Sequence, residues 1–174
     1  MIKQVPFGKY EFPENTYAFS KSAIDVFTKS KNLKWREKIL EVVKSGKINV
    51  AITPIEIKGI KYLGNYRKVY LPIFKSHDSK IFYVTNIPFN SPFYSQLFDL
   101  YLNHNLHAGD LSIVMVAIEH DLPLVTDDNH HWCFQQRFIK VYNERHKEKI
   151  AKRLAKRKYF EMYTSKDFCN LKII

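Results

Sequence analysis

The chain has 174 residues, of which 45% are hydrophobic and 15% aromatic, so it can fill one core and is not globally disordered. Lys and Arg number 28 against 17 Asp and Glu, and the formal charge of +11 favours a polyanionic partner, nucleic acid ahead of an anionic membrane surface. No segment approaches the roughly 18 apolar residues of a spanning helix and no signal-peptide run opens the chain, so we expect a cytoplasmic protein outside the membrane.

Short apolar runs along the chain predict β-strands. Before the first of them, residues 1–16 hold Pro6, Gly8 and Pro13, which predict an irregular N-terminal extension with an edge strand at residues 9–12. A single domain is then expected over residues 17–174. Its strands are predicted, in chain order, at residues 17–19, 48–52, 81–84, 124–126 and 159–163.

Segments with helical periodicity separate these strands. Helices are predicted at residues 20–27 and 33–44, from Thr53 onward, and at residues 92–102, 111–120 and 135–158, the last strongly basic. Strands that alternate with helices form βαβ units. The fold class predicted is therefore α/β, with a central, mainly parallel sheet.

Three carboxylates fall at one edge of this predicted sheet. Glu56 lies in the first turn of the helix that starts at Thr53, Asp110 opens the helix at residues 111–120, and Asp128 follows the strand at residues 124–126. The carboxyl ends of strands and the amino ends of the following helices share the edge where α/β sheets bind ligands. Taken singly, each acid also fits a helix cap, a helix dipole or a turn.

Grouped carboxylates repel one another, so such a cluster needs a cation, and hard oxygen donors suit Mg²⁺ or Mn²⁺. We therefore predict a metal site at Glu56, Asp110 and Asp128. A divalent ion there can lower the pKa of a water molecule, align it on a phosphodiester and stabilise the leaving oxygen.

Two segments of the sequence resemble the PIN-domain family of metal-dependent nucleases, which includes toxins of the VapC kind. The first runs from Ala108-Gly109-Asp110-Leu111 to Leu124-Val125-Thr126-Asp127-Asp128 and is similar to the family's acidic helix start and "LVT-x-D" strand end. The second, residues 48–56, looks like the strand that leads to the family's Glu. The resemblance covers about residues 17–168 and implies an α/β/α sandwich, with Asp127 as a supporting acid.

The sequence departs from the family pattern at the first metal-binding acid. Aligned by its distance to Glu56, the family's Asp-Thr-Ser segment falls on Ser20-Lys21-Ser22, so Ser20 stands where the first metal-binding Asp is expected. Asp25 is the nearest substitute, and a second alignment makes residues 23–27 the strand end. Glu14 is a third candidate.

Ten Lys and Arg residues load the segment 137–158, against Glu144 and Glu148 alone. Contact with RNA phosphates is one interpretation of this charge and a solvated helix face is the other. The residues expected to bind RNA are Lys149, Lys152, Arg153, Lys156 and Arg157.

Two functions follow as hypotheses. The first is a Mg²⁺-dependent endoribonuclease with Glu56, Asp110 and Asp128 on the metal and Asp127 or Asp25 assisting. The second is a PIN-like domain that has lost its first acid and binds RNA or a protein without cleaving. If the chain is a toxin, an antitoxin would be its partner, and a homodimer is a further expectation.

Overall fold

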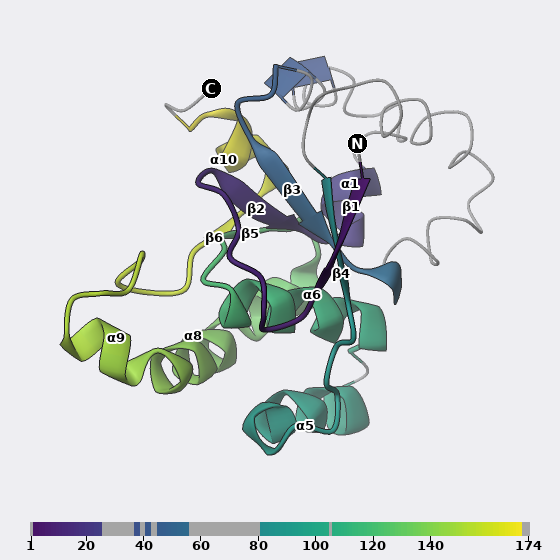
Figure 1. Ribbon diagram of the computed structural model, residues 1–174. Helices are drawn as coiled ribbons and strands as arrows, with labels where there is room; N and C mark the ends of the chain where they lie inside the picture. The colour runs from purple at the N-terminus through teal and green to yellow at the C-terminus, as the bar shows by residue number, and fades with distance from the viewer. Residues whose placement is uncertain are drawn as a thin grey trace.

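The computed structural model describes residues 2–25, 37–38, 41–42, 45–55, 81–104 and 106–171. Six strands in these ranges form one sheet, in which every neighbouring pair is parallel and the spatial order is β1-β4-β3-β2-β5-β6 (Figure 1). The strands are β1 Ile2–Pro6, β2 Thr16–Phe19, β3 Asn49–Ile52, β4 Ile81–Thr85, β5 Leu124–Val125 and β6 Met162–Tyr163. The predicted α/β class with a parallel sheet is confirmed.

A loop without helix joins β1 to β2, and helices follow each strand from β2 onward. They include the 3₁₀ helix η3 Pro92–Tyr94 and the α-helices α1 Lys21–Asp25, α5 Ser95–His104, α6 Ala108–Glu119, α7 Asn129–Cys133, α8 Gln135–Arg145, α9 Lys147–Ala151 and α10 Ser165–Cys169. Pro54 and Ile55 are helical directly after Thr53, as predicted. Most of the helix predicted at residues 33–44 lies outside the described residues.

Side chains of β2 point alternately to two apolar layers, as the period of a strand requires. Tyr17 and Phe19 point to one face, where Phe168 of α10 packs edge-on against both rings, with centroids 5.0 and 5.3 Å away. Ala18 points to the other face and joins the cluster that contains α6. A parallel sheet buried on both faces explains why its strands appear in the sequence as continuous apolar runs.

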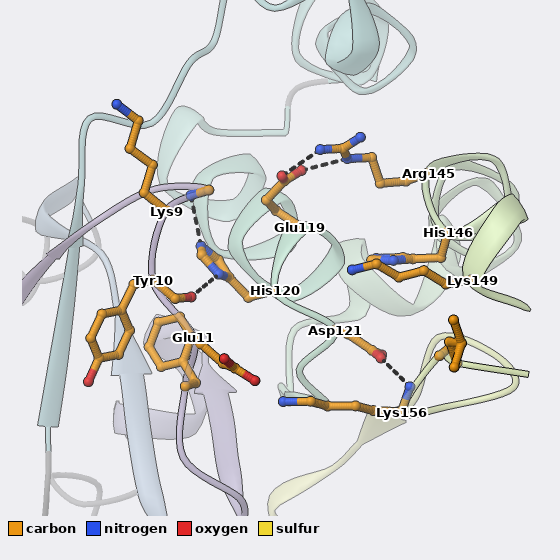
Figure 2. A pocket seen from close by; sticks show the side chains of 14 residues that line it. Lys9, Tyr10, Glu11, Glu119, His120, Asp121, Arg145, His146, Lys149 and Lys156 are labelled. Carbon is orange, nitrogen blue, oxygen red and sulfur yellow. Dashed lines mark hydrogen bonds and ion pairs between the residues drawn. The ribbon is translucent and has the colours of Figure 1, made fainter.

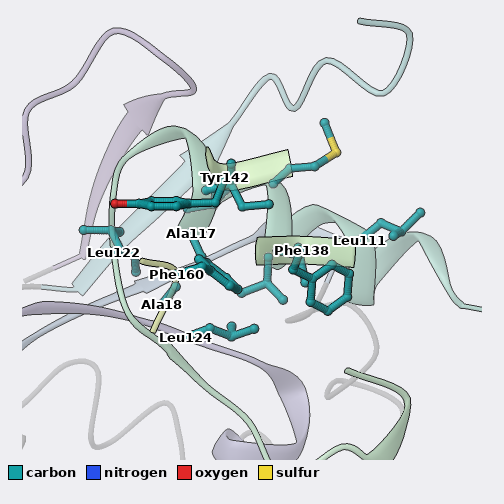
Figure 3. Close-up of a cluster of buried hydrophobic side chains, with 14 of the residues drawn as sticks. Ala18, Leu111, Ala117, Leu122, Leu124, Phe138, Tyr142 and Phe160 are labelled. Atoms are coloured by element: carbon teal, nitrogen blue, oxygen red, sulfur yellow. The ribbon is translucent and has the colours of Figure 1, made fainter. Parts of the chain in front are cut away.

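Helix α6 is the centre of the larger layer. Every residue from Leu111 to Ile118 is buried, because the sheet covers one side of the helix while α5 and α8 cover the other. Figure 3 shows Ala117 of α6 in one cluster with Leu124 of the sheet and Phe138 of α8. A helix that is apolar all round is stable only when it is enclosed in this way.

The N-terminal strand differs from the prediction. Residues 9–12 form no strand, whereas β1 pairs in parallel with β4 from Ile2 to Pro6 and forms the edge of the sheet. The segment Ile2-Lys3-Gln4-Val5 has a polar centre that hides it from a search for apolar runs, and Pro6 is tolerated because it ends an edge strand. Residues 2–6 thus belong to the sheet and are not an extension to it.

The continuous basic helix predicted at residues 135–158 is wrong. The chain forms α8, breaks at His146, forms α9 and leaves the helical conformation after Ala151. Arg153 adopts a left-handed φ of 56°, and the amides of Arg153 and Leu154 bond back to the carbonyls of Ile150 and Lys149. This is the Schellman helix ending, which usually shows glycine at the position of Arg153.

No helix within the described ranges is long and apolar enough to cross a membrane.

Truncation of Phe168 to Ala should lower the free energy of unfolding by about 3–5 kcal/mol, because the ring is fully buried between Tyr17 and Phe19. Urea titration followed by circular dichroism measures the loss. Tyr159→Ala is the control: this ring is 60% exposed, and its removal should change stability by no more than about 0.5 kcal/mol. Equal losses in the two variants would show that α10 does not form a second core layer.

Candidate functional site

The strand order reverses direction between β2 and β5. From β2 the chain passes outward through β3 and β4, and it then returns to the other side of β2 to form β5 and β6. In open α/β sheets, ligands bind in the crevice outside the carboxyl ends of the strands at such a point. The residues that leave these two strands, Ser20 after β2 and Thr126 after β5, therefore mark the candidate site.

A chain of hydroxyl groups joins the two strand ends. The Ser20 hydroxyl lies 2.8 Å from the Ser22 hydroxyl and 2.9 Å from that of Thr126. Thr126 Oγ1 in turn lies 2.7 Å from Nδ1 of His131, at the start of α7. Ser20, Thr126 and His131 are all buried.

The direction of each hydrogen bond follows from the far end of this hydroxyl chain. Nε2 of His131 lies 3.2 Å from the Asp110 carbonyl oxygen, which can only accept, so Nε2 carries the proton and Nδ1 accepts from Thr126. Thr126 then accepts from Ser20 and from the Asp128 amide, and Ser20 accepts from Ser22. Every hydroxyl hydrogen in the hydroxyl chain has an acceptor, with His131 neutral.

Electrostatics favour the same neutral form. Burial lowers the pKa of His131 below its usual value of 6.5, and this effect exceeds the attraction of the Asp110 and Asp128 carboxylates, which raises it. Asp110 is next to His131 through its backbone carbonyl, and Asp128 is the N-cap residue of α7, the helix that contains His131. Asp110 and Asp128, predicted from the sequence to share an edge, do lie at the carboxyl ends of the strands.

Local bonds fix the carboxylates of the edge. Asp110 is the third residue of α6, and its Oδ2 accepts from the amide of His107, 3.1 Å away. Asp128 caps α7 by accepting from the amide of His130 at 2.8 Å. These are the capping roles that each acid fits when considered alone, and they also hold the two carboxylates in place.

Asp127 faces a different neighbour. Its Oδ1 accepts from the amide of Ser165 at 2.8 Å, and its Oδ2 accepts from the hydroxyl of the same serine. Ser165 begins α10, so Asp127 ties the end of β5 to the layer on the other face of the sheet. The predicted supporting acid thus has a structural partner of its own.

The structure orders the candidates for the first acid. Residues 21–25 are helical and β2 ends at Phe19, so the alignment that made residues 23–27 a strand end is wrong. Asp25 is the last residue of α1. Glu14 lies in the turn before β2, at the amino end of the strand and hence at the opposite edge of the sheet. Ser20 is the residue at the carboxyl end of β2.

The third acid of the predicted metal site is Glu56. Within the ranges that the structure describes, no three His, Cys, Asp or Glu side chains are grouped to hold a metal ion, and Glu56 lies outside them. The end of β3 nevertheless reaches the same region, since the hydroxyl of Thr53 lies 2.7 Å from that of Ser112 in α6. The three-acid metal site remains a prediction.

The residues expected to bind RNA fall into two groups. Lys149, Lys152, Arg153 and Lys156 are exposed. Arg157 instead forms ion pairs with Asp121 at 3.7 Å and with Glu161 at 3.4 Å, so its guanidinium holds the loop after α9 against the end of α6.

No known family model matches the chain, and no characterised protein matches it either. The PIN-domain resemblance therefore rests on the residues of this chain alone.

Replacing Thr126 with Val should lower the free energy of unfolding by at least about 2 kcal/mol. Valine leaves the buried Ser20 hydroxyl without its acceptor, takes the donor away from the buried Nδ1 of His131, and removes the acceptor of the half-buried Asp128 amide. Thr126→Ser keeps the hydroxyl and removes one methyl group, at a cost of about 1 kcal/mol. Chemical denaturation of both variants tests the role of the hydroxyl, which requires the valine variant to be the less stable.

The stability of the protein should decrease on mild acidification. Burial lowers the pKa of both His120 and His131, so the unfolded chain binds protons near pH 6.5 while the folded chain binds them only at lower pH. Stability is therefore fully present above about pH 6.5 and is lost as the pH falls toward the folded pKa values, by up to about 1.4 kcal/mol per pH unit for each histidine.

Urea midpoints measured between pH 7.5 and 5.5 test this dependence. His131→Gln should make the dependence shallower by the contribution of this one histidine and leave that of His120. A wild-type protein that becomes more stable on acidification would contradict the assignment of neutral histidines.

Proposed function

We propose that the protein is a metal-dependent endoribonuclease whose reaction takes place at the carboxyl edge of the sheet, between β2 and β5. The observation that supports this best is that Asp110, whose carbonyl contacts His131, and Asp128, which caps the helix of His131, both lie at the reversal of strand order. Two carboxylates at a ligand-binding edge, in a chain of charge +11, suit a polyanionic substrate that brings phosphate oxygens to a shared cation.

The donors present fit Mg²⁺. This ion keeps several waters and is commonly held by one or two protein carboxylates together with substrate phosphates, so Asp110 and Asp128 are a sufficient protein contribution. The resemblance adds Glu56 as a further ligand, and Asp25 is the nearest substitute for the family's first acid. When bound, the ion would supply a water of lowered pKa and stabilise the leaving oxygen.

The chain's own residues hold this edge in place. His131 binds the Asp110 carbonyl through Nε2 and the Thr126 hydroxyl through Nδ1, so it fixes the first turn of α6 against the end of β5. Being neutral, His131 forms no ion pair with either carboxylate, whereas Nδ1 of His130 lies 3.2 Å from Oδ1 of Asp128.

Ser20 supports a second candidate function, an RNA-binding module that does not cleave. Its hydroxyl is committed to Ser22 and Thr126 and is only 1% exposed, so it offers no charge to a metal at the position of the family's first acid. Under this alternative, the exposed basic residues after α8 bind RNA, while the sheet edge that carries Asp110 and Asp128, here called the acidic edge, does not catalyse cleavage.

Cleavage of a 5′-labelled single-stranded RNA in Mg²⁺ or Mn²⁺ distinguishes the two. We expect cleavage that EDTA abolishes and that Asp110→Asn and Asp128→Asn each reduce by at least about 100-fold, since each substitution removes a metal-binding charge. Asparagine keeps an oxygen that can cap the helix, so both variants should fold.

Asp99→Asn is the matched control, because Asp99 is a carboxylate of α5 that pairs with Arg137 on the surface. Its activity should equal that of the wild type. RNA binding without cleavage, unchanged by EDTA, would reject the nuclease and favour the binding module. In that case Ser20→Asp, which restores the missing acid, tests whether cleavage can be recovered.

A further inference from the structure

A cavity of about 710 Å³ lies at the end of α6 opposite to Asp110. Its walls are the loop of residues 8–12, the residues Glu119, His120 and Asp121 that end α6, and the chain from the end of α8 to Lys156 (Figure 2). Nine residues of helix separate Asp110 from Glu119, a rise of roughly 13 Å, so this cavity is not part of the acidic edge. Its volume is that of a small-molecule site.

The loop wall is held by a neutral histidine. Nε2 of His120 accepts from the amide of Gly8, and its Nδ1 donates to the carbonyl of Tyr10, each across 3.1 Å. The ring of Phe12 packs edge-on against the imidazole with centroids 4.8 Å apart. The cavity is thus preformed on this side and does not depend on a loose loop.

Two of the three acids in the wall are already neutralised. Glu119 accepts two hydrogen bonds from Arg145, at 2.8 and 2.7 Å. Asp121 accepts from the hydroxyl of Tyr142 and pairs with Arg157. The positive charges of Arg145 and Arg157 therefore offset the negative charges of these two acids, which reduces their repulsion of an anion.

The remaining charges of the wall are mainly positive. They are Lys9, Lys149 and Lys156 against Glu11, and within the described part of the chain none of the three lysines has a carboxylate at ion-pair distance. Figure 2 shows Lys149 and Lys156 extending from the α9 side toward the loop that carries Tyr10 and Glu11. Their ammonium groups therefore face the space between the walls.

We propose that this cavity binds a phosphate-bearing ligand of nucleotide size, with Lys149 and Lys156 holding the phosphate. The cavity is far larger than one phosphate requires, and its lining is mostly polar, which suits a sugar and base attached to the anion. The ligand is a free nucleotide or one unit of an RNA strand. This site goes beyond the proposed function and does not depend on it, because no residue of the acidic edge lines the cavity.

Calorimetric titration with AMP, UMP, adenosine and inorganic phosphate tests the site, using the full-length protein without added metal. We expect both nucleotides to bind and adenosine to bind at least about tenfold more weakly, because it lacks the anion. Lys149→Gln with Lys156→Gln should weaken AMP binding by at least about tenfold, the effect of losing one charge-assisted hydrogen bond.

Lys147→Gln with Lys158→Gln is the matched control. It removes the same charge from two exposed lysines that do not line the cavity, and AMP affinity should stay within about twofold of the wild type. Equal weakening in the two double variants would show that only the overall charge matters and would refute the cavity as the binding site. If inorganic phosphate binds as tightly as AMP, the proposal that the ligand is of nucleotide size is wrong.

A 5′-phosphorylated single-stranded RNA identifies the source of the ligand. Tighter binding than AMP, with the same dependence on Lys149 and Lys156, assigns the cavity to an RNA strand, and equal binding assigns it to a free nucleotide. Binding only to phosphatidylserine vesicles, with no affinity for AMP or RNA, would refute the proposal. Asp110→Asn should leave AMP affinity unchanged, so loss of cleavage and loss of this site are separate outcomes.

Discussion

The burial of helix α6 is the constraint on which the rest of the structure depends. From Leu111 to Ile118 no side chain reaches water, so the helix must have the sheet on one side and α5 and α8 on the other. Enclosure of its length leaves only its two ends accessible. The polar chemistry of the domain is accordingly concentrated there, with Asp110 in the first turn and Glu119, His120 and Asp121 at the last.

The two ends satisfy their backbone groups in different ways. At the amino end, Asp110 accepts from the His107 amide, and the Asp110 carbonyl accepts from His131. At the carboxyl end, the amides of Asp121 and Leu122 fold back onto the carbonyls of Ile118 and Ala117, with Asp121 at a left-handed φ of 53°. At the amino end the Asp110 carboxylate stays at the surface of the domain, as the helix dipole favours. At the carboxyl end, the last residues of α6 form one wall of a cavity that Lys149 and Lys156 also line.

Sequence reasoning succeeded where burial dictates a pattern and failed where a single residue departs from its usual conformation. The strand at Leu124 and the helix around Val114 follow from continuous apolar runs, and the shared edge of Asp110 and Asp128 follows from strand direction. The end of α9 does not, because Arg153 adopts the conformation expected of glycine. The structural role of Arg157 could not be predicted from neighbouring residues either, because its partner Asp121 is distant in the sequence.

Two features of the candidate sites could not be read from the chain at all. The central role of Thr126 depends on the Ser20 hydroxyl, 106 residues away in sequence, the His131 side chain, five residues away, and the Asp128 amide. A threonine at a strand end carries no signal of these partners. The cavity near Lys149 is assembled from the β1–β2 loop, the end of α6 and the chain around α9. The packing of α8 against α6, and the pairing of Arg157 with Asp121, bring these segments together.

Ser20 links the stability of the acidic edge to its chemistry. A carboxylate in this buried place would have to be paired with a cation or lose its charge, since an unpaired buried charge is strongly unfavourable. The serine closes a neutral hydrogen-bond chain through Thr126 to His131, so the edge is stable before any ion binds. Under the proposed function, a neutral Ser20 gives a metal one carboxylate fewer than the family resemblance implies. The charge that attracts an RNA would then come from the exposed lysines after α8, two of which, Lys149 and Lys156, line the cavity at the other end of α6.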